Sequence, residues 1–88
     1  MRLKYITYER FGEESFVVFP QHVAHSDWGN ILDNGRTKLL GAGEVSYYYD
    51  EERGGQAEVR ARCYGESVSL WLKSRNNADS NILNRCQD

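Results

Sequence analysis

The chain has 88 residues, a formal net charge of −2 and 12% aromatic residues, six of which are tyrosines. This length predicts one domain, residues 1–88, built around a single core. The charge argues against a general DNA-coating protein, which needs a basic surplus, and the acidic excess is too small to mimic a duplex. A domain of this size buries roughly 60–65% of the surface that its unfolded chain exposes, so we expect modest stability and a homo-oligomer.

The hydropathy of the chain predicts a cytoplasmic protein. No apolar window is long enough to span a bilayer, and Met1-Arg2 is not followed by the apolar segment of a signal peptide. Cys63 and Cys86 are the two cysteines. In a reducing compartment free thiols are the default. A disulfide stays an alternative, because separation in sequence does not set distance in space.

The first twenty residues predict a β-hairpin. Leu3 to Tyr8 and Ser15 to Phe19 have the composition of strands, the loop between them carries Gly12, and Pro20 ends the second strand. The second strand is apolar on both faces, which favours a central position in the sheet.

The next segment predicts a short helix followed by an extended stretch. Ser26 or Asp27 is a suitable N-cap, although Gly29 weakens the helix. Its apolar residues recur at spacings of three and four, and they are Trp28, Ile31 and Leu32. The helix is expected to end at Asp33-Asn34-Gly35. Thr37 to Leu40 is a short extended piece, and Gly41-Ala42-Gly43 permits a bend or bulge.

A second hairpin is predicted from Glu44 to Asp50 and from Gln56 to Tyr64, with Glu51 to Gly55 as the turn. Residues alternate between two faces in a strand. In the first strand we expect the core-facing side chains to be Val45, Tyr47 and Tyr49, with Tyr48 pointing outward. In the second, one face carries Ala57, Val59, Ala61 and Cys63, and the other carries Glu58, Arg60, Arg62 and Tyr64.

The chain ends in a predicted helix that begins near Asn76-Asn77 and has Asp79 in its first turn. Its apolar stripe consists of Ala78, Ile82, Leu83 and Cys86, and this stripe should lie across a sheet face. The fold class is therefore α+β: an antiparallel sheet of four to five strands in two hairpins, with a short central helix and a C-terminal helix.

Hydroxyl and cationic side chains gather between Gly65 and the last helix, and they are Ser67, Ser69, Lys73, Ser74 and Arg75. Hydroxyls, main-chain N–H groups and helix N-termini are what proteins use to hold phosphate. Arg60 and Arg62 on the preceding strand would add bidentate contacts. In the alternative interpretation, Ser67 and Ser69 are solvent-facing strand positions, opposite Val68, Leu70 and Leu72.

The outward-facing tyrosines belong to the same candidate site. Tyr48 and Tyr64 lie beside Arg60 and Arg62 in the predicted hairpin, where such rings stack on a nucleobase or anchor a protein partner. Ordinary cross-strand pairing is the alternative.

Metal binding and catalysis are less well supported. His22 and His25, with Asp27, resemble half of a metal site, but the two cysteines lack the paired spacing of structural zinc ligands. Cys63 falls on the apolar face of its strand, where cysteine acts as a small hydrophobe. No acid pair has a catalytic spacing and no glycine-rich phosphate loop occurs. We expect no metal, no cofactor and no enzyme.

Four segments, SFVVFP, HSD, GAGEVS and CYGESVSLWLKSR, occur in an order that resembles small uncharacterised proteins encoded by bacteriophages and prophages. The resemblance implies a proline after LKSR, where this chain has Asn76. It also implies a context, the cytoplasm of a host bacterium. Accessory proteins of this kind blunt host defences by trapping a signalling nucleotide or by covering a defence complex, and neither mechanism needs catalysis.

Together these observations predict a non-enzymatic counter-defence protein that sequesters a phosphate-bearing, cyclic nucleotide signal. The expected ligand-binding residues are Tyr48, Arg60, Arg62, Tyr64, Ser67, Ser69, Lys73, Ser74 and Arg75. The alternative is a protein–protein inhibitor of a host defence complex, similar to an anti-CRISPR. Its contact surface would be the exposed tyrosines and the two acidic loops, Glu13-Glu14 and Asp50-Glu51-Glu52. Neither hypothesis involves a membrane or general nucleic-acid binding.

Overall fold

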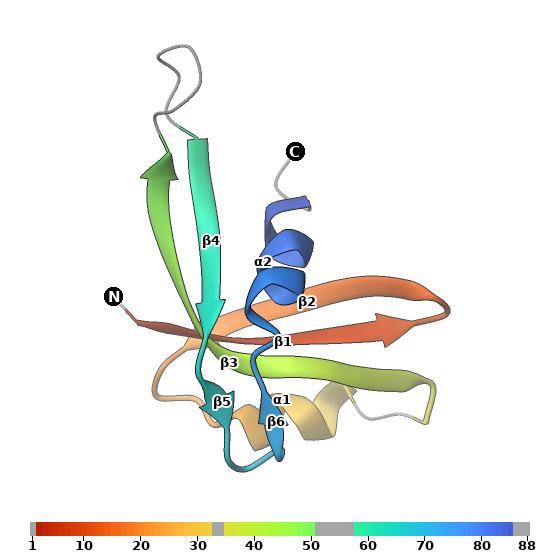
Figure 1. Ribbon diagram of the computed structural model, residues 1–88. Coiled ribbons are helices and arrows are strands. Elements are labelled where there is room, and N and C mark those ends of the chain that lie inside the picture. The colour runs from red at the N-terminus through yellow and green to blue at the C-terminus, as the bar shows by residue number, and fades with distance from the viewer. Residues whose placement is uncertain (1, 33–34, 51–57, 86–88) are drawn as a thin grey trace.

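The computed structural model describes residues 2–32, 35–50 and 58–85. Its elements in chain order are β1 (Leu3–Arg10), β2 (Glu13–Pro20), α1 (His25–Leu32), β3 (Thr37–Asp50), β4 (Glu58–Tyr64), β5 (Glu66–Ser67), β6 (Leu72–Lys73) and α2 (Asn76–Arg85). The first four strands form one antiparallel sheet in the order β2-β1-β3-β4, and β5 pairs with β6 (Figure 1). The α+β fold predicted from the sequence is confirmed.

The N-terminal hairpin has the two-residue turn Phe11-Gly12 between the paired residues Arg10 and Glu13. Both turn residues have positive φ, 55° and 79°, which is the backbone conformation that matches the twist of the two strands. Glycine adopts it freely, whereas Phe11 does so at a steric cost. The predicted hairpin is confirmed.

The prediction that the second strand is central in the sheet is wrong, because β2 lies at the edge and β1 and β3 are central. Its apolar residues serve two separate clusters. Phe16 and Val18 pack on the α2 side, and Val17 and Phe19 pack on the α1 side. The apolar character of both faces therefore reflects two layers over the sheet.

The long strand β3 belongs to two pairings. Its first part pairs with β1 and its second part, from Glu44, pairs with β4. Thr7 is opposite Gly41 but Tyr8 is opposite Leu39, so Leu40 is an extra residue in the ladder, close to the bend or bulge that the glycines predict. The β3–β4 hairpin turns away from β1 and β2 and projects from the body of the protein (Figure 1).

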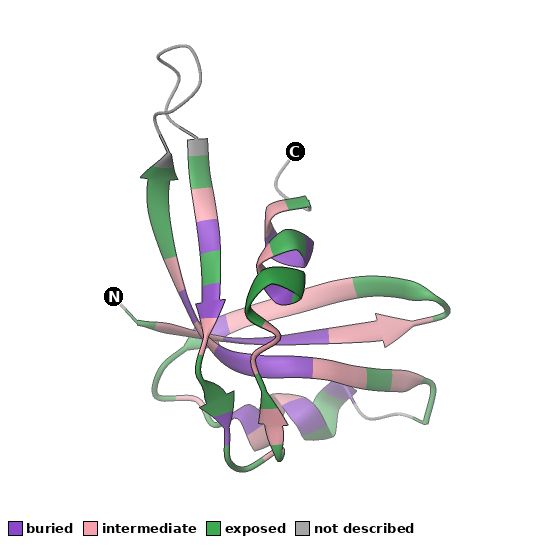
Figure 2. Ribbon diagram, in the orientation of Figure 1, coloured by how far each residue is buried: buried purple, intermediate pink, exposed green. Residues whose placement is uncertain are grey.

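Two apolar clusters lie on opposite faces of the sheet. The first contains Tyr5, Val45, Ala61, Cys63 and, from α2, Leu83. The second contains Ile6, Phe19, Ala42 and, from α1, Leu32. Figure 2 shows that the buried residues concentrate where β1, β3 and β4 meet, while the outer part of the β3–β4 hairpin is exposed.

Helix α1 differs from its prediction in two respects. It begins at His25, ahead of the predicted caps, and Ile31 is exposed although its spacing placed it on the apolar stripe. Gly29 is buried, and a Cβ atom there would lie 2.6 Å from Leu70 Cδ2. The glycine that weakens the helix thus permits a close approach to the β5–β6 segment.

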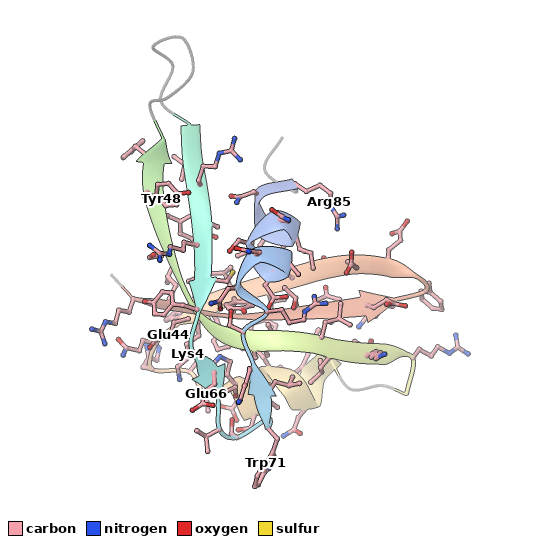
Figure 3. The ribbon with its side chains drawn as sticks, in the orientation of Figure 1. Lys4, Glu44, Tyr48, Glu66, Trp71 and Arg85 are labelled. Carbon is pink, nitrogen blue, oxygen red and sulfur yellow. The ribbon has the colours of Figure 1, made fainter. Side chains whose placement is uncertain are left out.

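Strand β4 ends before Gly65, and the chain after it does not continue that strand. Gly65 has φ 81°, and after it β5 and β6 form a small hairpin. The interpretation of Ser67 as solvent-facing opposite an inward Val68 is wrong, because Ser67 is buried and Val68 is exposed. Trp71 has φ 57° and is 93% exposed at the tip, where it points away from the body (Figure 3). Neither helix within the described ranges is long and apolar enough to cross a membrane.

Candidate functional site

A polar depression of about 890 Å³ lies between the β3–β4 hairpin and helix α2. It is lined by Ser46, Tyr48, Arg60, Ala61, Arg62, Asn77, Ser80, Asn81 and Asn84. Among the described residues that line it, two carry guanidinium groups and none carries a carboxylate. The depression is therefore a cationic site in a chain whose net charge is −2.

One wall of the depression is α2, whose side chains bind the free edge of β4. The Asn84 Oδ1 atom accepts a hydrogen bond from the Ala61 amide at 2.7 Å, and its Nδ2 donates to the Ala61 carbonyl at 3.2 Å. The Cys63 amide donates to Ser80 Oγ at 2.9 Å. Buried main-chain groups need such partners, and these bonds fix the helix beside the strand.

The start of α2 is fixed by Asp79, whose side chain is fully buried. Its carboxylate accepts hydrogen bonds from the Tyr5 hydroxyl at 2.6 Å, the Thr7 hydroxyl at 2.9 Å and the Arg75 amide at 2.9 Å. The Arg75 guanidinium forms an ion pair with it at 2.9 Å. A Cβ atom on Gly41 would collide with this carboxylate, so the site requires glycine. The sequence indicated only an acidic residue in the first turn.

Burial of the Tyr5 ring, and next its hydrogen bond to the carboxylate, raise the pKa of its hydroxyl. The Tyr5 hydroxyl also lies 2.6 Å from Ser74 Oγ. The cluster therefore joins β1 to the segment that leads into α2, and it keeps Tyr5 protonated as a hydrogen-bond donor.

The floor of the depression is one face of the β3–β4 hairpin. Tyr48 is paired with Arg60 and Ser46 with Arg62, so the four side chains share a face. Tyr48 is 47% exposed. The predicted outward orientation of Tyr48, beside the two arginines, is consistent with this arrangement.

The opposite face of the hairpin corrects another prediction. Tyr47 and Tyr49 share the face of Val45, as expected, but they are exposed and not packed in the core. Tyr49 is 73% exposed. The reason is geometric, because the hairpin extends beyond the apolar cluster that buries Val45.

The structure does not bring the nine predicted ligand-binding residues together in one site. Tyr48, Arg60 and Arg62 line the depression, whereas Tyr64, two residues beyond Arg62 on the same face of β4, is not among the lining residues. A second hollow, of about 240 Å³, is lined by residues that include Ser67 and Lys73. It shares no lining residue with the first. The buried Ser67 hydroxyl is 3.4 Å from that of the exposed Ser69. Ser74 and Arg75 belong to the Asp79 cluster.

The sequence interpretation missed the polar wall of the depression. It consists of Asn77, Ser80, Asn81 and Asn84 from α2. Their spacing of three and four residues places them on one helix face. That periodicity is a usable signal in the sequence, because it marks a polar face on the same helix as the apolar stripe.

His25 is buried, and its Nε2 lies 2.9 Å from the Gly43 carbonyl oxygen. Burial lowers the pKa of His25, so the neutral imidazole donates this bond. His22 is exposed. Over residues 2–32, 35–50 and 58–85, no group of three or more metal-ligating side chains comes together.

Cys63 is a buried free thiol, and burial raises its pKa to about 11. Its thiolate is therefore a minor species near neutral pH, and a nucleophilic role has no support here. Cys86 and the predicted turn at 51–55 lie outside the described residues.

Comparison of this chain with protein families, curated proteins and solved structures finds no significant match. The functional argument therefore starts from the chemistry of the depression.

Proposed function

We propose that this protein is a non-enzymatic binding protein that sequesters a phosphate-bearing nucleotide in the depression between the β3–β4 hairpin and α2. The observation that supports the proposal is the lining itself. It combines the guanidinium groups of Arg60 and Arg62 with the ring of Tyr48.

Each part of this lining has a matching part in a nucleotide. A guanidinium group is a planar fork of N–H donors that binds phosphate oxygens bidentately. An exposed tyrosine ring is a platform on which a base stacks. The amides of Asn77 and Asn81 both donate and accept hydrogen bonds, as the edge of a base or a ribose requires. A volume of about 890 Å³ also falls within the range of small-molecule sites.

The biological role that we propose is counter-defence. The resemblance to phage-encoded accessory proteins suggests that the nucleotide is a cyclic immune signal in the cytoplasm of a host bacterium. A protein that binds such a signal without converting it lowers its free concentration, so no catalytic group is needed.

Calorimetry tests this function. The purified protein is titrated with cyclic mononucleotides, cyclic dinucleotides and cyclic ADP-ribose isomers. We expect one ligand class to bind, and we expect Arg62→Ala to weaken that binding at least tenfold, since a charge-assisted hydrogen bond is lost. Lys73→Ala removes a cation outside the depression and should leave the affinity unchanged. No heat with any member of the panel would reject the proposal.

A protein–protein inhibitor is the second candidate, and one observation favours it. Trp71 is 93% exposed and holds a positive φ of 57° at the tip of the β5–β6 hairpin. Strained residues gather at functional sites, and tryptophan is enriched among the residues that dominate protein interfaces. Binding of a purified host defence complex, lost in Trp71→Ala but kept in Arg62→Ala, would favour this candidate over nucleotide binding.

A further inference from the structure

The face that forms the floor of the depression has a regular order of side chains. The register defines three successive rows across β3 and β4, namely Tyr48 with Arg60, Ser46 with Arg62, and Glu44 with Tyr64. The first two rows line the depression, and the third row lies beyond its lining. The two tyrosines thus lie at opposite ends of a face whose middle carries the two arginines. Rows are two residues apart, or about 7 Å, so the tyrosine rows are separated by about 14 Å.

A mononucleotide would use only part of this face. Tyr48 and Arg60 are directly opposite each other and together match one base and one phosphate. Arg62 and Tyr64, successive residues on the same face of β4, repeat that pair of chemical groups. Tyr64 is partly exposed. The face therefore carries the pair of a tyrosine ring and a guanidinium group twice.

We infer that the ligand is a dinucleotide, with one base stacked on Tyr48, the other on Tyr64, and its two phosphate groups on Arg60 and Arg62. This inference rests on the proposed function and narrows it to one class of ligand. Arg60 and Arg62 lie on successive rows of this face, so each guanidinium group would bind one of the two phosphates.

The third row differs from the first two in its charge. Glu44 stands opposite Tyr64, so this row carries a carboxylate and no cation for a further phosphate. On its other side Glu44 pairs with Lys4 of β1, and the two side chains lie near each other at the base of the hairpin (Figure 3). The face therefore supplies guanidinium groups for two phosphates and none for a third.

The wall supplies a means of recognising the bases. Asn77 and Asn81 are one helical turn apart on α2 and both are exposed. An asparagine amide forms two hydrogen bonds with the N6 and N7 edge of adenine. Adenine is thus the first base to test. The shared chemistry, two bases around two phosphates, is found both in cyclic dinucleotides and in nucleosides joined by a pyrophosphate.

Four adenine ligands separate these possibilities by calorimetry: AMP, ADP, cyclic di-AMP and diadenosine diphosphate. We expect at least one of the two-base ligands to bind tenfold or more tightly than AMP and ADP. The tighter of cyclic di-AMP and diadenosine diphosphate identifies the linkage. ADP is the control that has a second phosphate but no second base. The corresponding four guanine ligands are measured in parallel.

Variants assign the bases to the tyrosines. Tyr48→Leu should weaken every ligand at least fivefold, whereas Tyr64→Leu should weaken only the two-base ligands, because a mononucleotide occupies the row of Tyr48. Tyr49→Leu alters the opposite face of the same strand and should change nothing. Tyr64→Phe keeps a ring and should retain the affinity, which separates stacking from a loss of folding in Tyr64→Leu.

The inference is overturned if AMP or ADP binds as tightly as the two-base ligands, or if Tyr64→Leu leaves the affinity of a folded protein unchanged. In those cases the proposed nucleotide function stands and only the ligand class is wrong. If no ligand of either base series binds, the function and the inference fall together.

Discussion

The side chain of Asn84 takes the place of a neighbouring strand for Ala61. Its amide accepts the Ala61 N–H at 2.7 Å and donates to the Ala61 carbonyl at 3.2 Å, so one side chain binds both main-chain groups of a buried residue. These bonds cover part of the free edge of β4. They also place α2 beside the hairpin, where it forms one wall of the depression.

Asn84→Ala should lower the free energy of unfolding by about 1–3 kcal/mol, because the buried N–H and C=O groups of Ala61 lose their partner. Asn81→Ala is the matched control, since Asn81 is an exposed residue of the same helix. Its effect should stay within about 0.5 kcal/mol. Urea unfolding measures both, and equal effects would show that the Asn84 bonds contribute little.

Asp79→Ala should destabilise the protein more than any single change in its partners. The Tyr5 hydroxyl, the Thr7 hydroxyl and the Arg75 amide would lose their common acceptor, at about 1–3 kcal/mol for each buried group. Tyr5→Phe removes the hydrogen bond to this carboxylate together with the contact to Ser74 Oγ, and it should cost about 1.5–3 kcal/mol. Thermal unfolding ranks the two variants, and a smaller loss for Asp79→Ala would contradict the central role of this carboxylate.

The hairpins were predictable because their signals are local. Strand composition, Gly12 and Pro20 define the first, and the paired alternation of the second also places Tyr48 beside Arg60. The burial of Asp79 was not predictable in this way. Its partners Tyr5 and Thr7 are 74 and 72 residues away in sequence, and no local pattern in α2 marks the contact.

The candidate site was predictable only where it lies on paired strands. Arg60 and Arg62 were found because strand register places them on one face with Tyr48. The hydroxyl and cationic residues after Gly65 are close in sequence, which is why they were predicted to form one site. The structure separates them, because the chain turns at Gly65 and because Arg75 forms an ion pair with the buried Asp79. The edge position of β2 was not predicted. Apolar residues on both faces show that both faces are covered, but they do not show whether the strand has one neighbouring strand or two.

Acid should destabilise the protein through His25. Burial lowers its pKa below the ordinary value of 6.5, an effect that nearby Lys4 reinforces and the hydrogen bond to Gly43 opposes. The unfolded chain therefore takes up the proton first as pH falls, and the contribution of His25 to stability, complete above pH 6.5, is lost below it.

Denaturant unfolding at about pH 8 and about pH 5 measures this loss. His25→Gln, which keeps a donor for the Gly43 carbonyl, should show a smaller acid-induced loss than the wild-type protein. His22→Gln, at an exposed site, should behave as wild type. An acid-induced loss unaltered by His25→Gln would show that other groups cause it.

Trp71→Asn should raise the free energy of unfolding by about 1 kcal/mol, since asparagine tolerates the left-handed conformation that strains a bulky residue. Few contacts are lost, because the Trp71 side chain is 93% exposed. Trp71→Ala, which leaves the strain in place, should bring no such gain. A lower stability for Trp71→Asn would mean that the ring packs against the protein.

The nucleotide proposal is tested most directly by mass spectrometry of the small molecules that heat releases from protein purified out of a bacterial host. We predict that the wild-type protein and Lys73→Glu release a phosphate-bearing nucleotide, and that Arg62→Glu, which reverses a charge in the depression, releases none. Nucleotide binding in this depression would be contradicted if all three proteins released the same nucleotide. It would also be contradicted if none of them released a nucleotide and calorimetry detected no binding.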